Sequence, residues 1–390
     1  MKALLARLDE LYPEMVNIRR KLHMEPELSF QEVKTPAFIG DYLQSLGIEV
    51  RRNVGGRGVV GYIRGRLPGK TVALRADFDA LPIEEETGLP FASKVKGVMH
   101  ACGHDGHTAT LLGLAKALNE YKDHFRGTIV LIHQFAEEVA PGGAIAMIED
   151  GCLNGVDAIY GTHLWSTFPY GKVGYRSGSI MAYADRFEIK VKGRGGHGAR
   201  PHETVDSIVV ASSIVTALQQ IVSRNVNPLQ SAVLTIGSFH GGNAFNVIAD
   251  HAVIAGTVRT LQRDVQQLIK KRIKDVANGV AAAMGATVNV TYDEGYPAVV
   301  TDEAETKRLV QAVQTHCPDV ALFEMEPEMV GEDFAYYLQK VPGTFFFTGA
   351  GNVDKGIVYP HHHPKFNFEE KAMLTAAKCL ASVALDFLND

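Results

Sequence analysis

The order of strand and helix patterns constrains the fold of this chain most strongly. In its first 182 residues, short apolar strand segments alternate with segments that repeat apolar residues every three or four positions. Continuous apolar strands of this kind predict a covered, mostly parallel central sheet with helices on both faces, an α/β domain. The expected strands are 59–63, 71–76, 128–135 and 157–162, and the expected helices are 3–23, 36–46, 108–121 and 143–150.

The pattern changes near residue 183. Residues 184–192 alternate apolar and charged side chains, which indicates a strand with one exposed face. The segments that follow give the order β-α-β-β-α-β, typical of an α+β ferredoxin-like domain. We therefore expect a catalytic α/β domain from 1–182 and 294–390, with an inserted lid or dimerisation domain at 183–293. The remaining expected elements are strands 184–192, 232–237, 252–259, 287–292 and 344–348, and helices 205–222, 263–284, 303–315 and 369–388.

Composition and charge exclude several classes of protein. The 390 residues are 46% hydrophobic and carry a net charge of −5, which argues against disorder and against a nucleic-acid partner. No strongly apolar stretch approaches a membrane span, and the apolar run 3–6 is too short for a signal peptide. Four cysteines make no disulfide framework. We expect a cytoplasmic protein without a membrane partner, in which Cys152, Cys317 and Cys379 are packing residues.

Two glycine motifs fail as nucleotide sites. Residues 56–61 match GxGxxG, and residues 65–71 resemble a P-loop, but the sequence after each predicts a strand. Both motifs need a helix there, because the helix N-terminus meets the phosphates. The chain also lacks a GxSxG nucleophile elbow.

Metal-binding residue types follow the expected strands of the first domain. Ligands in open α/β sheets bind at the carboxyl ends of strands, so these residues are expected to gather at one edge. Each alone is more often structural, as a turn residue, a helix cap or a hydrogen-bonded histidine. Their coincidence favours a metal site. The residues are Asp77 and Asp79, the segment 100–107 with its Cys102, His104 and His107, Glu137 and Glu138, His163, and the run 361–363.

The chemistry of these residues suits hydrolysis. A thiolate with imidazoles favours zinc, with cobalt, nickel or manganese as alternatives. Cys102 and His104 would face one point if their segment is extended. Glu137 and Glu138 are adjacent, and Pro141 just beyond them indicates that the backbone turns. One carboxylate could then bind metal while the other takes a proton from a metal-bound water.

Other candidate residues have ordinary interpretations as well. In the run 361–363, at most two histidines can be ligands. His197 lies in a glycine-rich loop and is expected to be exposed. Arg259 could simply form a surface ion pair, and Asn246 could simply be a turn residue. Asp105 and His107 are expected to orient the ligands or to cap a helix.

The ordered motifs resemble one family along the full length of the chain. The chain is similar to the di-metal amidohydrolases of the aminoacylase, hippurate hydrolase and auxin-conjugate hydrolase group, relatives of the dizinc carboxypeptidases. The matching motifs are RKLHMEPEL (20–28), LRADFDALP (74–82), HACGHDGH (100–107), QFAEE (134–138), GGHGARPH (195–202), NVI (246–248), GTVRT (256–260) and HHPKF (362–366).

The resemblance implies a role for each matching residue. Glu137 would be the general base, and His197 would polarise the scissile carbonyl, reaching across a dimer interface as in relatives. Asn246 and Arg259 would hold the substrate carboxylate, since the planar guanidinium matches a carboxylate. A homodimer or homotetramer is implied. Two divalent metal ions per subunit would be held by Cys102, His104, Glu138, His163 and His362.

One departure concerns the early strand. The wider dizinc peptidases use a His-x-Asp motif there as a ligand, whereas this chain has Asp77-Phe-Asp79 and the Cys102/His104 pair. The bridging ligand is therefore open, and we favour Cys102. Asp77 is then expected to support the ligands.

Several reactions remain open. The expected one is hydrolysis of the amide of an N-acyl-L-amino acid, with an N-acetyl or aromatic acyl group, to a carboxylic acid and a free amino acid. A dipeptidase, a carboxypeptidase or an N-acetyl-diaminopimelate deacetylase would use the same chemistry. A cysteine hydrolase built on Cys102, or a metal-binding protein without activity, would leave several of the other residues unexplained.

Overall fold

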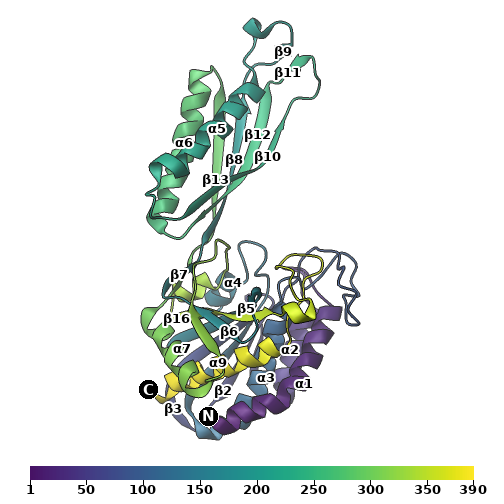
Figure 1. The fold of residues 1–390 in the computed structure, drawn as a ribbon, viewed down its shortest axis with the longest axis vertical. Helices are drawn as coiled ribbons and strands as arrows, with labels where there is room; N and C mark the ends of the chain where they lie inside the picture. Colours follow the sequence, from purple (N-terminus) through teal and green to yellow (C-terminus); the bar gives the residue numbers. More distant parts are fainter. The chain divides into compact units, whose positions relative to one another are not determined.

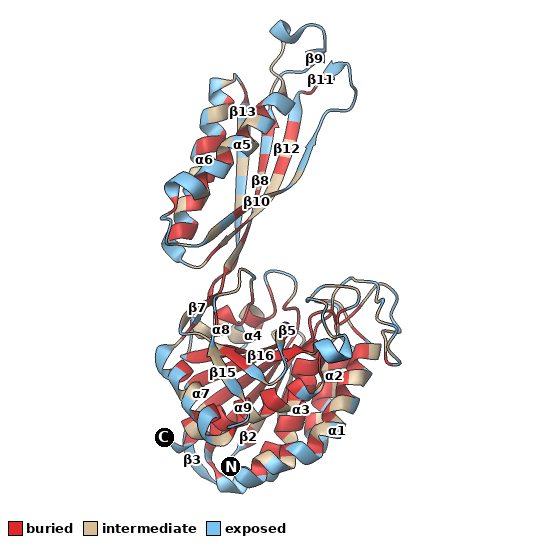
Figure 2. Ribbon diagram, viewed as in Figure 1, coloured by how far each residue is buried: buried red, intermediate tan, exposed pale blue.

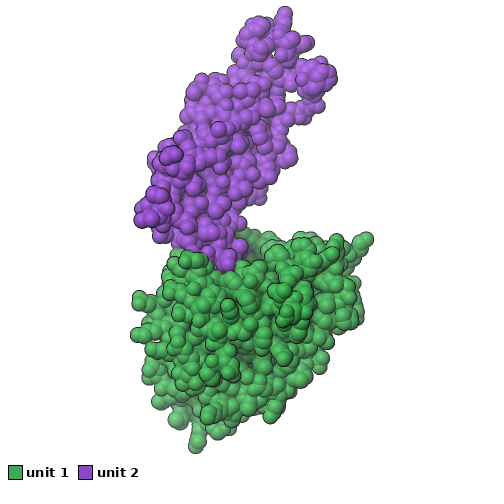
Figure 3. All heavy atoms as spheres, viewed as in Figure 1, with its two compact units in different colours: residues 1–180, 300–326, 333–390 green, residues 181–299, 327–332 purple.

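The computed structural model describes all 390 residues. The chain folds into two compact units (Figure 3). Unit 1 comprises residues 1–180, 300–326 and 333–390, and unit 2 comprises residues 181–299 and 327–332. The short return of the chain to unit 2 at 327–332 has no counterpart in the expected organisation. A two-stranded pair, β7 (Gly178–Met181) with β14 (Val299–Thr301), stands where the chain passes between the units.

Unit 1 is built on an eight-stranded sheet of order β1-β2-β4-β3-β5-β16-β6-β15 (Figure 1). The four central strands run parallel to one another, whereas β1, β2 and β6 join by antiparallel pairing. The expected mostly parallel central sheet is confirmed. The strands are β1 (Glu49–Val54), β2 (Gly58–Arg64), β3 (Leu67–Asp77), β4 (Arg126–Gln134), β5 (Ala158–Pro169), β6 (Lys172–Tyr175), β15 (Ala321–Glu324) and β16 (Gly343–Gly351).

Helices cover both faces of this sheet. On one face Tyr160 of β5 contacts Phe387 of α9, with 6.4 Å between ring centroids. On the other face a Cβ atom on Gly161 would meet Phe334, next to α8, at 2.8 Å. Alternate residues of one strand thus touch opposite layers. The helices are α1 (Lys2–Met24), α2 (Lys34–Ser45), α3 (His104–Glu120), α4 (Ala144–Glu149), α7 (Glu303–His316), α8 (Ala335–Leu338) and α9 (Lys371–Asn389), with single 3-10 turns at Lys122–His124 and Val353–Lys355.

Helix α9 is the most apolar part of this core. It and α5 of unit 2 are long and apolar enough by composition to span a membrane, with mean hydropathies of 1.3 and 1.2. In α9, 78% of that stretch is buried within the structure, and most of the helix has the colour of buried residues in Figure 2. A helix that is apolar on nearly all sides and packed between a sheet and other helices is the core helix of a globular unit.

Unit 2 is a four-stranded antiparallel sheet of order β10-β12-β8-β13 with two helices. Phe187, Ile189 and Val191 of β8 are buried against the helices, and the charged residues between them face the other side. The strand order and the β-α-β-β-α-β succession are those of a ferredoxin-like fold. The elements are β8 (Tyr183–Lys192), β9 (Gly196–His197), a 3-10 turn (Pro201–Glu203), α5 (Ser207–Asn225), β10 (Ala232–Gly241), β11 (Val247–Ile248), β12 (His251–Thr260), α6 (Arg263–Ala283) and β13 (Thr287–Tyr296).

Candidate metal centre

The candidate ligands gather at the carboxyl edge of the unit 1 sheet. His104 is buried there, with its Nε2 atom 3.7 Å from Asp77, the last residue of β3. The same Nε2 atom lies 4.0 Å from Glu137 and 3.8 Å from Glu138, which follow β4. Residues from two strands and one helix therefore meet at one point, as expected for ligands at the carboxyl ends of parallel strands.

The backbone between Cys102 and His104 is not extended, so that sequence argument was wrong. Gly103 has φ +88° and His104 is the first residue of α3, four residues earlier than expected. Glycine adopts this left-handed conformation without steric cost, and the sharp turn directs both side chains inward. Cys102, His104 and His163 consequently have ligand atoms within 4.8 Å of one another.

The turn expected after Phe135 is present. Strand β4 ends at Gln134, and Ala136 adopts φ +51°. The adjacent Glu137 and Glu138 therefore both lie near His104 instead of on opposite faces of a strand. Glu137 is buried, and the Glu138 side chain is 8% exposed.

His163 lies within a strand and not after one, which corrects its expected position. Strand β5 continues to Pro169 because it pairs with β16 beyond the point where its pairing with β3 stops, at Gly161. The Nδ1 atom of His163 is 2.9 Å from the carbonyl oxygen of Leu164, and its Nε2 atom is 3.5 Å from Cys102 Sγ. The backbone carbonyl thus orients this ring so that Nε2 faces the site.

Only one of the three consecutive histidines reaches the carboxylates. The backbone N–H of His362 donates to the carbonyl of Ala101, and its Nε2 atom lies 3.4 Å from Glu138. The Nε2 atom of His361 instead contacts the carbonyl of Leu164, and its ring stacks on Trp165. His363 stacks on Tyr359 and accepts the backbone N–H of Lys365.

The donor set fits a divalent metal. The sets Cys102/His104/His163, Cys102/Glu138/His362 and His104/Glu137/Glu138 each place their ligand atoms within 4.8 Å, and Cys102 belongs to two of them. His104 Nε2 and Glu138 Oε1 are buried without a hydrogen-bond partner. A buried polar atom without a partner costs free energy, and a cation between these atoms removes that cost.

The electrostatics of the site point the same way. Burial raises the pKa of the Cys102 thiol well above its ordinary value, and Glu138 and Glu137 raise it further. Burial opposes the charging of His104, yet Asp77 and Asp79 raise its pKa to about 10. Negative charge therefore exceeds positive charge here, which a cation would compensate. A raised thiol pKa is also the opposite of what a cysteine nucleophile needs.

Asp77 and His107 lie next to the candidate ligands and, with His104, also have ligand atoms within 4.8 Å of one another. Asp77 accepts a hydrogen bond from Arg75 at 2.7 Å and lies 2.6 Å from Nδ1 of His107. The other nitrogen of His107 accepts the backbone N–H of Leu164. Burial opposes ionisation of Asp77, but Arg75, His104 and His107 hold its pKa well below the ordinary value. Both nitrogens of His107 are engaged, so this ring fixes the backbone beside His163.

Asp105 does not cap α3, although capping was one expected role. Its carboxylate accepts hydrogen bonds from Arg19 at 2.9 Å and lies 2.9 Å from Nδ1 of His23. All three side chains are buried. Asp105 therefore ties the first turn of α3, which carries His104, to helix α1.

The sequence argument did not single out Asp79 as a supporting residue. Its Oδ1 atom lies 3.1 Å from Nδ1 of His104, while its Oδ2 atom accepts the backbone N–H of Glu138 and the hydroxyl of Ser29. The position of Asp79 after an apolar strand was the available signal. Its partners come from three distant segments, which pattern alone could not bring together.

The unit 2 candidates fall into two places. His197 in β9 pairs with Val247 of β11, directly after Asn246, whose carbonyl oxygen accepts the N–H of Gly198. Both His197 and Asn246 are exposed. Arg259 is half-buried near the end of β12, where it contacts Thr257 and the carbonyl of Val258. Asn246 thus lies with His197 and not with Arg259.

Comparisons with known proteins identify the family of the chain. The model of peptidase family M20/M25/M40 matches residues 73–386. The Bacillus subtilis protein YhaA, named as an amidohydrolase, is 57% identical over 98% of this chain and 96% of its own length. The N-acetyl-L-cysteine deacetylase of the same organism is 46% identical over 98% of this chain and 90% of its own length.

A solved structure supports the metal chemistry. The Bacillus subtilis YXEP protein, described as a dinuclear metal-binding peptidase, has a TM-score of 0.86 and is 38% identical. The match covers 98% of this chain and 99% of that one. These likenesses span nearly the whole chain and include both units. This chain therefore belongs to peptidase family M20/M25/M40 and is a metal-dependent hydrolase of the amidohydrolase kind.

Proposed function

We propose that this enzyme hydrolyses the amide bond of N-acyl-L-amino acids, releasing a carboxylic acid and a free amino acid. The observation that carries the proposal is the buried carboxylate of Glu137 beside a cluster of metal-ligand side chains. Such a pair of parts, a Lewis-acid site with an adjacent base, is what amide hydrolysis by water needs. The relative named as an N-acetyl-L-cysteine deacetylase supports an N-acyl amino acid substrate.

Each member of the centre has a proposed role. Two divalent metal ions, zinc before cobalt, manganese or nickel, would polarise the carbonyl and lower the pKa of water. Glu137 takes the proton of the attacking water and passes it to the leaving amine. Asp77, Asp105 and His107 keep the ligands in place. We propose Cys102 as the bridging ligand because the sets Cys102/His104/His163 and Cys102/Glu138/His362 together contain all five proposed ligands and share only Cys102. The five ligands are Cys102, His104, Glu138, His163 and His362.

The geometry of unit 2 bears on how His197 acts. Arg259 pairs with Ala184 at the start of β8, and His251 pairs with Lys192 eight residues further along. At about 3.3 Å per residue, this separates the two ends by about 26 Å. His197 follows the far end, whereas a substrate of dipeptide length spans only about 7 Å.

One copy of unit 2 therefore cannot place both residues on one substrate. We propose that Arg259 binds the substrate carboxylate, and that a second copy of the chain supplies His197 and Asn246. His197 then stabilises the oxyanion, and Asn246 reaches the substrate from the same loop pair. A homodimer, or a homotetramer built from it, follows from this arrangement. The four buried cysteines are free, as is typical of a reducing compartment, so we place the enzyme in the cytoplasm.

The first test is release of free methionine from N-acetyl-L-methionine. The purified enzyme is measured as isolated, after chelation, and after zinc, cobalt or manganese is added back. We expect chelation to abolish release and at least one metal to restore it. Hydrolysis of dipeptides or N-acetyl-diaminopimelate alone would replace the proposed substrate class. Release that a chelator leaves unchanged would contradict the mechanism.

A further inference from the structure

Glu32 is a buried glutamate to which the proposed mechanism assigns no role. It lies on the loop between α1 and α2, more than a hundred residues before Glu137 and Glu138, which follow β4. Its Oε1 atom accepts the backbone N–H of Ala136 at 2.9 Å, and its side chain is fully buried. Burial raises its pKa to about 7, with a contribution from Asp79.

The partner of Glu32 is the turn that directs Glu137. Ala136 adopts φ +51°, a left-handed conformation that a residue with a Cβ atom rarely takes. Both of its backbone groups are held, since its carbonyl accepts the N–H of Gly143 at 3.2 Å. On the other side of Glu137, the N–H of Glu138 donates to Asp79 at 3.0 Å. Two buried carboxylates thus hold the amides on either side of Glu137.

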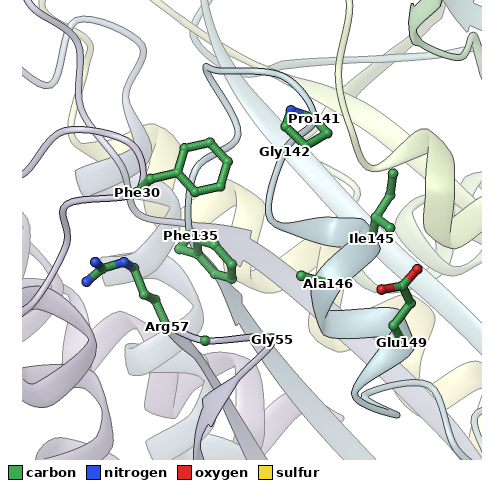
Figure 4. A pocket seen from close by; sticks show the side chains of 10 residues that line it. Phe30, Gly55, Arg57, Phe135, Pro141, Gly142, Ile145, Ala146 and Glu149 are labelled. Carbon is green, nitrogen blue, oxygen red and sulfur yellow. The ribbon is translucent and has the colours of Figure 1, made fainter.

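The segment 29–32 contacts this loop directly at Ala136 and Phe135, and indirectly through Asp79. The hydroxyl of Ser29 donates to Asp79 at 2.7 Å, and the ring of Phe30 meets the ring of Phe135 edge to face, with 5.9 Å between centroids. Arg57 in turn donates to the carbonyl of Glu32 at 2.5 Å. Phe30, Phe135 and Arg57 line a hollow of about 680 Å³, and Figure 4 shows their side chains on its wall.

We propose that Glu32 is a positioning residue for the reaction: its hydrogen bond keeps Ala136 in the left-handed conformation that aims Glu137 at the metal centre. The inference rests on the proposed function, which gives Glu137 its role as base. A residue that acts in this way changes the rate of the chemical step and leaves substrate binding and metal content in place.

The experiment compares Glu32→Ala with Glu32→Gln in the full-length metal-loaded enzyme. Glutamine keeps an oxygen that can accept the Ala136 N–H, whereas alanine leaves that N–H without a partner. We expect Glu32→Ala to lower kcat about 100-fold with KM unchanged, because small misplacements of a catalytic group cost rates of this order. Glu32→Gln should stay within about 5-fold of wild type, because the hydrogen bond remains.

Glu27→Ala is the matched control. Glu27 accepts the backbone N–H groups of Val33, Lys34 and Thr35 at 2.8 to 3.0 Å, and so caps α2 from the same loop. These contacts do not include the 135–138 loop. Glu27→Ala should lower Tm and leave kcat near the wild-type value.

Three results of the kinetic and metal measurements would overturn the proposal. They are an unchanged kcat in Glu32→Ala, loss of bound metal from that variant, or equal loss of kcat in Glu32→Ala and Glu32→Gln. Hydrogen exchange gives a second readout that needs no turnover. The Ala136 amide should exchange faster in Glu32→Ala than in Glu27→Ala, and equal exchange would overturn the proposal. A wild-type enzyme inactive on N-acyl amino acids would refute the proposed function, while the exchange rates would still decide the role of Glu32.

Discussion

The candidate residues of unit 1 and those of unit 2 are held in different ways. Cys102, His104 and His163 are buried, and neighbouring side chains and carbonyls orient them. His197 and Asn246 are exposed on a short two-stranded ribbon. A buried site is built by the packing of its own unit, whereas exposed residues acquire their function only through what binds to them. The metal centre is therefore a property of one chain, and the proposed role of His197 requires a second.

Two ion pairs, one from each unit, also differ in burial: the pair in unit 1 is buried and the pair in unit 2 is exposed. Arg19 and Asp105 of unit 1 are fully buried and 2.9 Å apart. Burial opposes ionisation of Asp105, but Arg19 and His23 hold its pKa far below the ordinary value. In unit 2, Glu294 is exposed and pairs with Lys270 and Arg263. Breaking the Arg19–Asp105 pair leaves a buried charge without its partner. Water screens the charges of the Glu294 pairs, so breaking those costs less.

The largest expected effect is that of Glu137→Gln. Removing the general base should lower kcat about 1,000-fold, because positioned acid–base groups contribute factors of this size. The five proposed ligands remain, so metal content should stay at the wild-type level. Steady-state kinetics and metal analysis of the same preparation check both expectations, with Glu149→Gln, an exposed change on α4, as the control. Metal loss, or kcat within 10-fold of wild type, would remove Glu137 from its role.

Arg19→Ala tests the buried ion pair of unit 1. The change leaves the buried Asp105 with only His23 as a charged partner, which should lower the free energy of unfolding by about 3–5 kcal/mol. Arg20→Ala is the matched neighbour: Arg20 pairs with Glu370 at the surface, so about 1 kcal/mol or less is expected. Urea unfolding in the presence of chelator measures both, since bound metal would otherwise add its own stabilisation. Equal losses would show that burial does not distinguish the two pairs.

His197→Ala and Arg259→Ala test whether a second chain completes the site. Each variant alone should lose about 100-fold in kcat/KM, the size expected for one oxyanion or carboxylate contact. When equal amounts of the two unfolded variants are refolded together, about half of the dimers contain one chain of each variant. The mixture then tests whether His197 acts across the dimer. If it does, each mixed dimer has one complete site, so about a quarter of wild-type activity should return. No recovery in the mixture would mean that both residues act from the same chain.

The proposed role of Arg259 also predicts that its loss affects substrates with and without a free carboxylate differently. Arg259→Ala should slow hydrolysis of N-acetyl-L-methionine more than hydrolysis of its methyl ester, because the ester has no carboxylate for the guanidinium to pair with. Comparison of kcat/KM for the two substrates measures this. An equal loss on both would contradict a carboxylate contact.

The smallest expected effect belongs to the exposed pair of unit 2. Hydrogen bonds from Lys270, Gln267 and Arg263 lower the pKa of Glu294 to about 2. Its stabilisation is therefore present above its ordinary value of 4.5 and is lost as pH falls from there to about 2. Glu294→Gln should cost less than about 1 kcal/mol at pH 7, and less still at pH 3. Thermal unfolding at both pH values checks this, with Asp293→Asn as control. A larger cost at pH 3 would contradict the assignment.

Much of the fold followed from periodicity, and the misses have specific causes. The alternation in β8 and the apolar strands of unit 1 predicted both sheets, because burial on one or two faces leaves a direct mark on residue type. His163 was placed after its strand because pairing with β16 extends β5, and such pairing is long-range. His104 was placed in an extended segment because a helix that starts after a left-handed glycine looks locally like a loop.

What the sequence by itself determined is the set of chemical groups: a thiol, imidazoles and carboxylates, most of them close to the end of a strand or the start of a helix. Much of this is local, because turn residues and helix starts depend mainly on neighbouring residues. The family resemblance implied His362 among the three histidines at 361–363, and only the tertiary structure showed that it faces Glu138 and that Asn246 lies with His197 and away from Arg259. It also brought Glu32 to Ala136 and Arg19 to Asp105. These pairs join segments far apart in the chain, and their geometry depends on how whole helices and sheets pack.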